Sequence, residues 1–348
     1  MLKIDVFCHI FPPRYWQVMT ERIAGSAYMQ KRVRGIPTLH DLDLRFQLLA
    51  PYPDYVQVLS LAAPPIEALA PPAEAAELAR LANEGLAELC QRYPDRFVGF
   101  VASLPMNDPE GAVEEARYAI DELGATGVQI YTNVNGAPLD QPIYEPLFAF
   151  MAERDLPIWV HPSREPEVAD YRTEERSKYD IWWCFGWPYE TSVFMARMVF
   201  WGLFDRYPNI KIITHHMGGM VPYFEGRVGW GLDSLGRRTD DPEDQAARER
   251  LRERPYEYFR RFYADTALFG ALPATECGLA FFGSERVLFA TDFPFDPQGG
   301  KVFLAETMRV IDNLTASIED KQRIYEGNAR RLLRLRLPNG EVERNANA

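Results

Sequence analysis

The chain has 348 residues, of which 47% are hydrophobic and 25% charged, and its formal net charge is −12. This is the composition of a globular protein, which excludes disordered and fibrous classes, and the acidic balance argues against nucleic acid, whose phosphates attract a basic face. No apolar run reaches membrane-spanning length, and no basic segment precedes a long apolar stretch at the N-terminus, so we expect no membrane contact and a cytoplasmic location.

Eight short runs rich in β-branched and aromatic residues alternate with segments of helical periodicity. The first run, residues 3–9, reads KIDVFCH, and the alternation of strand side chains predicts that Asp5, Phe7 and His9 share one face. The other runs cover residues 55–61, 97–103, 127–131, 157–161, 210–215, 261–265 and 286–292. Eight parallel strands with crossover helices close a barrel, so the expected fold is a distorted α/β (β/α)8 TIM barrel.

The segments between these runs predict helices, two long loops and a tail. The stretch that begins at Asp108, with Pro109 in the first turn, predicts a helix, and "PEDQAARERLRERP" predicts a charged surface helix. Two insertions, residues 14–40 and 162–187, follow strands one and five, where long loops usually carry function. The first is rich in aromatic and basic residues and is expected to lie over the barrel mouth. We expect a single domain over residues 1–337 and a C-terminal tail at residues 338–348.

Polar residues gather at the predicted carboxyl ends of the strands, where barrels of this type place their active sites. They are His9, His161, His215, His216, Asp265 and Asp292. Four of the five histidines of the chain therefore fall on one rim. Imidazole and carboxylate groups around one centre are ligands for one divalent ion, Zn²⁺ or Mn²⁺. The pattern predicts a metal site, with structurally satisfied histidines as the alternative.

Seven motifs in order along the chain carry a family resemblance. They are DxFxHxxPP at 5–13, VQVLS at 56–60, WVHPS at 159–163, PYETS at 188–192, DRYPNIKIITHHMGG at 205–219, ATDFPF at 290–295 and EGNARRLL at 326–333. The chain resembles the amidohydrolase superfamily, in the branch typified by aminocarboxymuconate semialdehyde decarboxylase and γ-resorcylate decarboxylase. The resemblance implies a small-molecule carboxylic acid as substrate and a homodimer or higher homo-oligomer.

The resemblance also implies roles for individual residues. His9, His161 and Asp292 match the metal ligands. Phe7 stands where the family has the first residue of an HxH or ExH pair, and it cannot ligate, which leaves the occupancy of the site open. His216 opens the HxGG motif and matches the residue that handles a proton or polarises a bound oxygen. His215 precedes it and is expected to face the opposite side as a structural residue.

Substrate-binding residues are implied at two arginines and one aromatic loop. Arg45 and Arg227 match positions that hold a substrate carboxylate, and the resemblance implies that Arg227 does so across a dimer interface. A planar guanidinium suits this role because it pairs with both carboxylate oxygens at once. The alternative for each is an arginine in an ordinary ion pair. Aromatic residues of the second insertion are expected to wall the pocket, or else to form a core plug or a dimer contact. They are Trp182, Trp183, Phe185 and Trp187.

These features favour a metal-dependent, non-oxidative decarboxylase of a hydroxylated aromatic or unsaturated carboxylic acid. Loss of CO₂ from an sp² carbon leaves an unstable carbanion unless that carbon is protonated, so Asp292 or His216 would act as general acid. A second hypothesis is a metal-dependent hydrolase or hydratase acting on a lactone, an amide or an activated double bond with the same ligands. A third is a metal-free descendant that has lost the chemistry, for which Phe7 is the main evidence.

Overall fold

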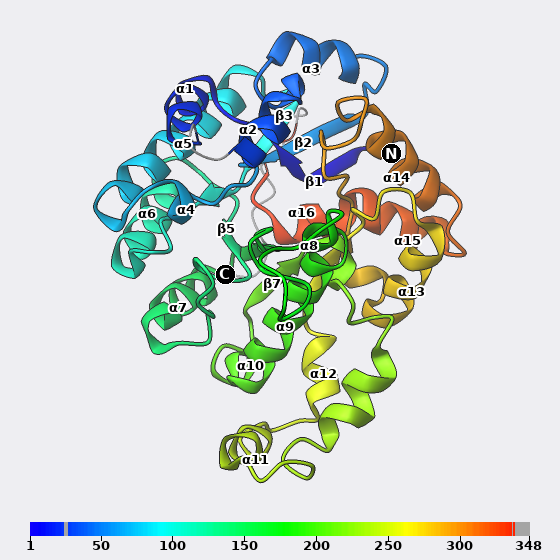
Figure 1. The fold of residues 1–348 in the computed structure, drawn as a ribbon. Helices are drawn as coiled ribbons and strands as arrows, with labels where there is room; N and C mark the ends of the chain where they lie inside the picture. Colours follow the sequence, from blue (N-terminus) through cyan, green and yellow to red (C-terminus); the bar gives the residue numbers. More distant parts are fainter. Residues whose placement is uncertain (24–26, 336, 338–348) are drawn as a thin grey trace.

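The strands follow one another around a closed ring in the computed structural model, which describes residues 1–23, 27–335 and 337 (Figure 1). One parallel sheet contains β1 (Lys3–His9), β2 (Tyr55–Ser60) and β3 (Phe97–Phe100). The other contains β4 (Ala102–Ser103), β5 (Val128–Tyr131), β6 (Pro157–His161), β7 (Lys211–Thr214), β8 (Tyr263–Asp265) and β9 (Val287–Leu288). Because only Val101 separates β3 from β4, the two pieces occupy one position, and the ring has eight.

Backbone hydrogen bonds close the ring between its first and last strands. The N–H of Val6 donates to the carbonyl of Phe289 at 3.0 Å, and the N–H of His9 donates to the carbonyl of Phe293 at 2.7 Å. Cys8 and Phe293 also form a parallel bridge. The last strand therefore lies beside β1, which confirms the predicted barrel.

Sixteen α-helices of the described residues surround or cap the ring. They are α1 (Pro13–Arg22), α2 (Ala27–Arg34), α3 (Leu42–Leu49), α4 (Ile66–Leu69), α5 (Pro72–Arg92), α6 (Pro109–Asp121), α7 (Glu145–Arg154), α8 (Ile181–Cys184), α9 (Gly186–Phe200), α10 (Leu203–Arg206), α11 (Pro242–Glu249), α12 (Pro255–Phe259), α13 (Leu272–Phe282), α14 (Lys301–Asp312), α15 (Ile318–Gln322) and α16 (Asn328–Leu332). None of the helices in the described part of the chain is both long enough and apolar enough to cross a membrane.

Two helices follow directly from their sequence signals. Helix α6 begins where expected, because the Asp108 side chain accepts a hydrogen bond from the N–H of Gly111 and Pro109 occupies the first turn. Helix α11 buries none of its residues and extends away from the barrel at the bottom of Figure 1, as predicted for a solvated, charged helix. The tail predicted at residues 338–348 lies outside the described residues.

The barrel interior is filled by one apolar cluster that includes Val58, Trp159 and Leu288 from different strands, with Leu332 of α16 joined to it. In β1 the predicted alternation is wrong. A register shift between Asp5 and Cys8 interrupts the pairing with β2, so that Val6 and Phe7 both join this interior cluster. The Asp5 carboxylate instead accepts hydrogen bonds from Tyr55 and Thr291 and leaves the interior to apolar groups.

Candidate active site

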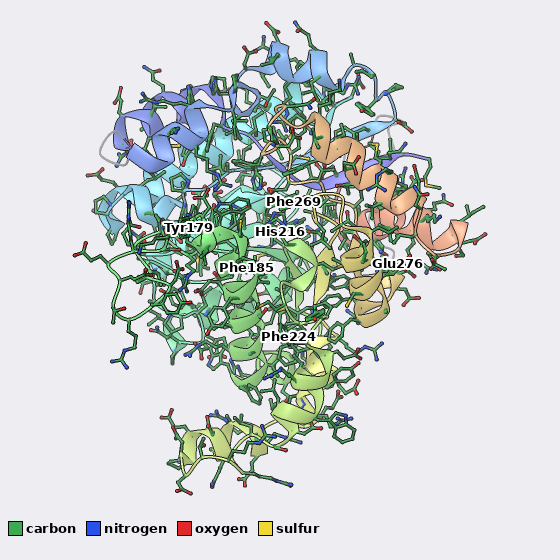
Figure 2. All side chains as sticks on the ribbon, turned by 45° about the vertical axis from the view of Figure 1, so that its right-hand side comes forward. Tyr179, Phe185, His216, Phe224, Phe269 and Glu276 are labelled. Atoms are coloured by element: carbon green, nitrogen blue, oxygen red, sulfur yellow. The ribbon has the colours of Figure 1, made fainter. Side chains whose placement is uncertain are left out.

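A cavity of about 850 Å³ opens at the carboxyl ends of the strands. His216 and Asp292 line it from the strand ends, and Arg32, Trp183 and Trp187 line it from the two insertions. A narrow extension of the cavity, also lined by Arg32, Trp187 and Asp292, reaches His161. Figure 2 shows His216 and Phe269 close together in the middle of the molecule, and their ring centroids are 5.3 Å apart. The site therefore lies where an active site of a (β/α)8 barrel is expected.

His9 and His161 present the same ring atom to the inside of the site. The Nδ1 atom of His9 faces the carbonyl of Leu61 at 3.0 Å, and that of His161 faces the carbonyl of Pro162 at 2.7 Å. A nitrogen that faces a carbonyl donates its proton, so Nε2 carries a lone pair in both rings. The buried Nε2 of His9 makes no hydrogen bond and lies 3.1 Å from Asp292 Oδ1. The lone pairs on His9 Nε2 and Asp292 Oδ1 repel each other unless a cation lies between the two atoms.

His215 lies inside the site, and its predicted structural position on the opposite face is wrong. Its Nδ1 atom contacts the Asp265 carboxylate, and its Nε2 atom lies 3.4 Å from Asp292 Oδ1. His216 also faces the cavity, with its Nδ1 atom 2.6 Å from the carbonyl of Ala267. Strand alternation ends here because His216 adopts a left-handed backbone with φ of 53°. Two consecutive histidines can therefore reach Asp292.

Local backbone geometry explains the glycines that follow. Gly219 has φ of +63°, and a Cβ atom there would lie 2.4 Å from the carbonyl oxygen of Pro188, so only glycine fits. Asp292, at the end of the last strand, is also left-handed, with φ of 60°. Non-glycine residues in this region cost about 1 kcal/mol or more each and often belong to functional sites.

Burial and the mutual contacts of these groups set their charges. Burial alone would raise the pKa of Asp292, but the neighbouring imidazoles of His215 and His9 hold that pKa well below its usual value. Burial and then His215 lower the pKa of His216 to about 4. Burial, followed by the rings of His215 and His9, lowers the pKa of His161 well below its usual value. Burial would also lower the pKa of His215, but Asp265 outweighs it and raises that pKa to about 9. At neutral pH Asp292 is a carboxylate, whereas His161 and His216 are neutral.

Three of the predicted substrate-binding residues lie outside the cavity of this chain. Arg45 is fully buried behind the strands and donates to Gln57 Oε1 and to the carbonyls of His9 and Thr38, so it supports the site and does not contact substrate. Arg227 is exposed, and Phe185 is 67% exposed. The remaining predicted contact, Trp183, does line the cavity.

Arg32 is a cavity residue that the motifs do not identify. Its guanidinium carbon lies 5.2–6.0 Å from the ring centres of Trp182, Trp183, Trp187 and Phe295. Arg32 lies on α2, and the first two of these tryptophans lie on α8, so this contact joins the two insertions over the cavity. The signal in the sequence was the basic and aromatic composition of residues 14–40, which marks the segment but does not select one arginine.

Comparison with protein families gives one match that spans most of the chain. Residues 4–335 match the family model described as Amidohydrolase. The chain belongs to the amidohydrolase family. This assignment confirms the resemblance seen in the motifs, and it agrees with the barrel and with the polar rim at its carboxyl ends.

Named relatives of this amidohydrolase are decarboxylases. The chain is 32% identical over 303 residues to a gamma-resorcylate decarboxylase of Rhodococcus jostii, covering 84% of this chain and 87% of the relative. It is 30% identical over 351 residues to a 2-amino-3-carboxymuconate-6-semialdehyde decarboxylase of Dictyostelium discoideum, covering 96% and 92%. Both relatives fall in the branch that the motifs predicted.

Solved structures of decarboxylases have the same fold. One is a 2,6-dihydroxybenzoate decarboxylase in complex with 2,6-dihydroxybenzoate, 27% identical, with a TM-score of 0.75 and coverage of 95% of this chain and 98% of that one. Another is a dihydroxybenzoic acid decarboxylase of Polaromonas with bound manganese and the inhibitor 2-nitroresorcinol, 28% identical, with a TM-score of 0.77 and coverage of 95% and 96%.

Proposed function

We propose that this amidohydrolase is a metal-dependent, non-oxidative decarboxylase of a hydroxylated aromatic carboxylic acid. The observation that carries the proposal is the cluster of buried histidines around the Asp292 carboxylate, at the floor of an aromatic-lined cavity. The flat indole surfaces of Trp183 and Trp187 suit an aromatic ring. The names of the relatives support the same reaction class.

The described residues fit a divalent metal ion. His9, His161 and Asp292 are the ligands we propose, because the unpartnered Nε2 atom of His9 faces the Asp292 carboxylate. The manganese in the Polaromonas relative favours Mn²⁺, and Zn²⁺ accepts the same ligands. When bound, such an ion supplies Lewis-acid polarisation of substrate oxygens.

Asp292 and His216 are the groups that can deliver the proton. Decarboxylation of an aromatic carboxylate consumes one proton, which ends on the carbon that loses CO₂. His216, with a pKa of about 4, is neutral at pH 7, and Asp292 is ionised. One of them must therefore take a proton from solvent or from a substrate hydroxyl before it acts as general acid.

Arg32 is the residue we propose for binding the substrate carboxylate. It lines both the cavity and its extension toward His161, and its side chain is partly buried among aromatic rings. A guanidinium in such surroundings binds a carboxylate more strongly than one in open water. The role implied for Arg227 then requires a second copy of the chain, so a homodimer is part of this proposal. A cytoplasmic location is also part of it.

The test is CO₂ release from a panel of hydroxybenzoates, including 2,6-dihydroxybenzoate, with the Mn²⁺-loaded protein. We expect one CO₂ for each acid consumed, and a loss of about 100-fold or more in His216→Ala. His40→Ala is the matched control, since His40 stacks on Trp16 outside the cavity with ring centres 4.2 Å apart. Hydrolysis of lactones without CO₂ release from any acid of the panel would contradict the proposal.

A further inference from the structure

Phe7 occupies the place at which the sequence motif predicts a metal ligand. Its ring centre lies 4.8 Å from that of His9 and 5.9 Å from that of His161, so the side chain does face the site. The ring of His215 is nearer still, with its centre 3.8 Å from that of Phe7. An apolar ring and an additional imidazole are thus packed together where the motif predicts one ligand.

The imidazole of His215 is oriented as a metal ligand would be. Its side chain is fully buried, and its Nδ1 atom is bound to the Asp265 carboxylate. Asp265 is itself held in place, because one of its oxygens accepts hydrogen bonds from the backbone N–H groups of His216 and Ala267, both at 3.0 Å. Carboxylate–histidine pairs of this kind fix the ring and the tautomer of metal-binding histidines.

The Nε2 atom of His215 points toward the other donors. It lies 3.4 Å from Asp292 Oδ1, and His9 Nε2 lies 3.1 Å from the same oxygen. Donor atoms of His9, His161 and His215 all lie within 4.8 Å of one another. Donors about 2.0–2.2 Å from one ion are themselves separated by about 3–3.6 Å, so the two measured separations fit a shared ion.

We propose that His215 replaces the ligand that Phe7 cannot supply, so that His9, His161, His215 and Asp292 together hold one divalent ion. Asp265 is a positioning residue that orients His215. The ligand set then has three imidazoles and one carboxylate, one imidazole coming from the end of β7 instead of from β1. Phe7 fills the volume beside the relocated ring. This inference rests on the metal dependence in the proposed function.

The test measures metal affinity without substrate, by competition with a chromophoric chelator for Mn²⁺ and Zn²⁺. His215→Ala should bind metal at least about 100-fold more weakly than the wild type, and Asp265→Asn about 10–100-fold more weakly. The double variant Phe7→His/His215→Ala returns a ligand to the first strand and should recover affinity to within about tenfold of the wild type. Circular dichroism and melting curves verify that each variant is folded.

His216→Ala is the matched control, because His216 is an adjacent buried histidine whose donor atom also lies near Asp292. We expect it to keep wild-type metal affinity, and we expect the visible spectrum of the Co²⁺ form to change in His215→Ala but not in His216→Ala. Wild-type affinity in a folded His215→Ala variant would overturn the inference, as would loss of metal in His216→Ala alone. A wild-type chain that binds neither metal would overturn both the inference and the metal dependence, whereas metal binding without CO₂ release would count against the proposed reaction only.

Discussion

Arg45 illustrates how one buried charge can support an active site without touching substrate. Its guanidinium bridges Gln57 on β2, the carbonyl of His9 at the end of β1 and the carbonyl of Thr38, and it lies 4.6 Å from the ring centre of Phe293. The contact with the His9 carbonyl joins the arginine directly to the strand end that carries a proposed metal ligand. Arg45 therefore acts on the position of that strand end.

Arg45→Ala should lower the free energy of unfolding by about 3 kcal/mol or more, because three buried acceptors lose their donor and a cavity opens. Urea denaturation followed by circular dichroism measures the loss. Arg172→Ala, at an exposed position of the second insertion, is the control and should change stability by less than about 0.5 kcal/mol. Similar losses of unfolding free energy in the two variants would show that the buried contacts of Arg45 do not stabilise the protein.

Arg32→Gln tests the proposed carboxylate contact at the cavity wall. Removal of a charge-assisted contact to substrate should raise KM about 10–100-fold, because such contacts contribute about 1.5–3 kcal/mol. Arg34→Gln is the control, since Arg34 lies on the same helix, α2, and is exposed. Steady-state kinetics on the best hydroxybenzoate give the comparison, and equal KM values for the two variants would assign the substrate carboxylate to another residue.

At the scale of elements, the eight strands could be predicted from the sequence because β-branched runs and helical segments alternate clearly. The predicted run 97–103 contains both β3 and β4, and the run 157–161 coincides with β6. The sequence predicted the wrong face for side chains at two places, and in both the regular strand geometry is interrupted. The register shift in β1 moves Asp5 off the face of Phe7. His215 continues the inward face of Ile213, and the left-handed backbone of His216 brings that second ring to the same site. Sequence periodicity carries no signal for either event.

The prediction that Arg45 binds the substrate failed for a different reason. A motif match gives a residue type and an approximate place in the chain. It does not show which hydrogen-bond acceptors that side chain already binds. Arg45 already donates hydrogen bonds to Gln57 and to two backbone carbonyls, which only the packed structure reveals. Arg32 reaches the cavity because α2 packs near α8, a contact between distant segments that has no local sequence signature.

Helix α6 offers a prediction at this scale. Asp108→Ala removes the side-chain acceptor of the Gly111 N–H and should destabilise the protein by about 1 kcal/mol, since α6 packs its buried face against the barrel. Asp241→Ala removes the equivalent acceptor, to Glu243, at the start of α11. Because α11 buries no residues, its fraying should leave global unfolding unchanged in thermal melts. Equal shifts in melting temperature for both variants would contradict this account.

At the scale of the whole molecule, the closed ring of strands brings distant segments of the chain to one point. His9 from the first strand meets Asp292 from the last, and His161 and His215 join them from the middle of the sequence. The site is therefore complete only when the ring has closed. Buried ionisable groups beneath such a site also make the stability of the entire barrel depend on pH.

Glu67 is the buried acid for which this dependence can be worked out. It is 5% exposed, its Oε1 atom has no hydrogen-bond partner, and burial raises its pKa from 4.5 to about 7. Between these values the unfolded chain has released the proton and the folded chain retains it. The free energy of unfolding therefore falls as the pH rises from about 4.5 to 7, by about 3 kcal/mol in total, and is level above that range.

Glu67→Gln removes the titration and keeps the shape of the side chain. The free energy of unfolding of the variant should equal that of the wild type near pH 4. The difference should grow as the pH rises, until the variant is about 3 kcal/mol more stable at pH 8. Urea denaturation of both proteins across this range gives the difference at each pH, in which the titrations shared by the two proteins cancel. Glu165→Gln is the comparison, because Glu165 is an exposed acid that lines the neighbouring extension of the cavity, and its contact with water should make the change with pH smaller. A stability difference between Glu67→Gln and wild type that stays constant with pH would mean that Glu67 is already ionised in the folded barrel.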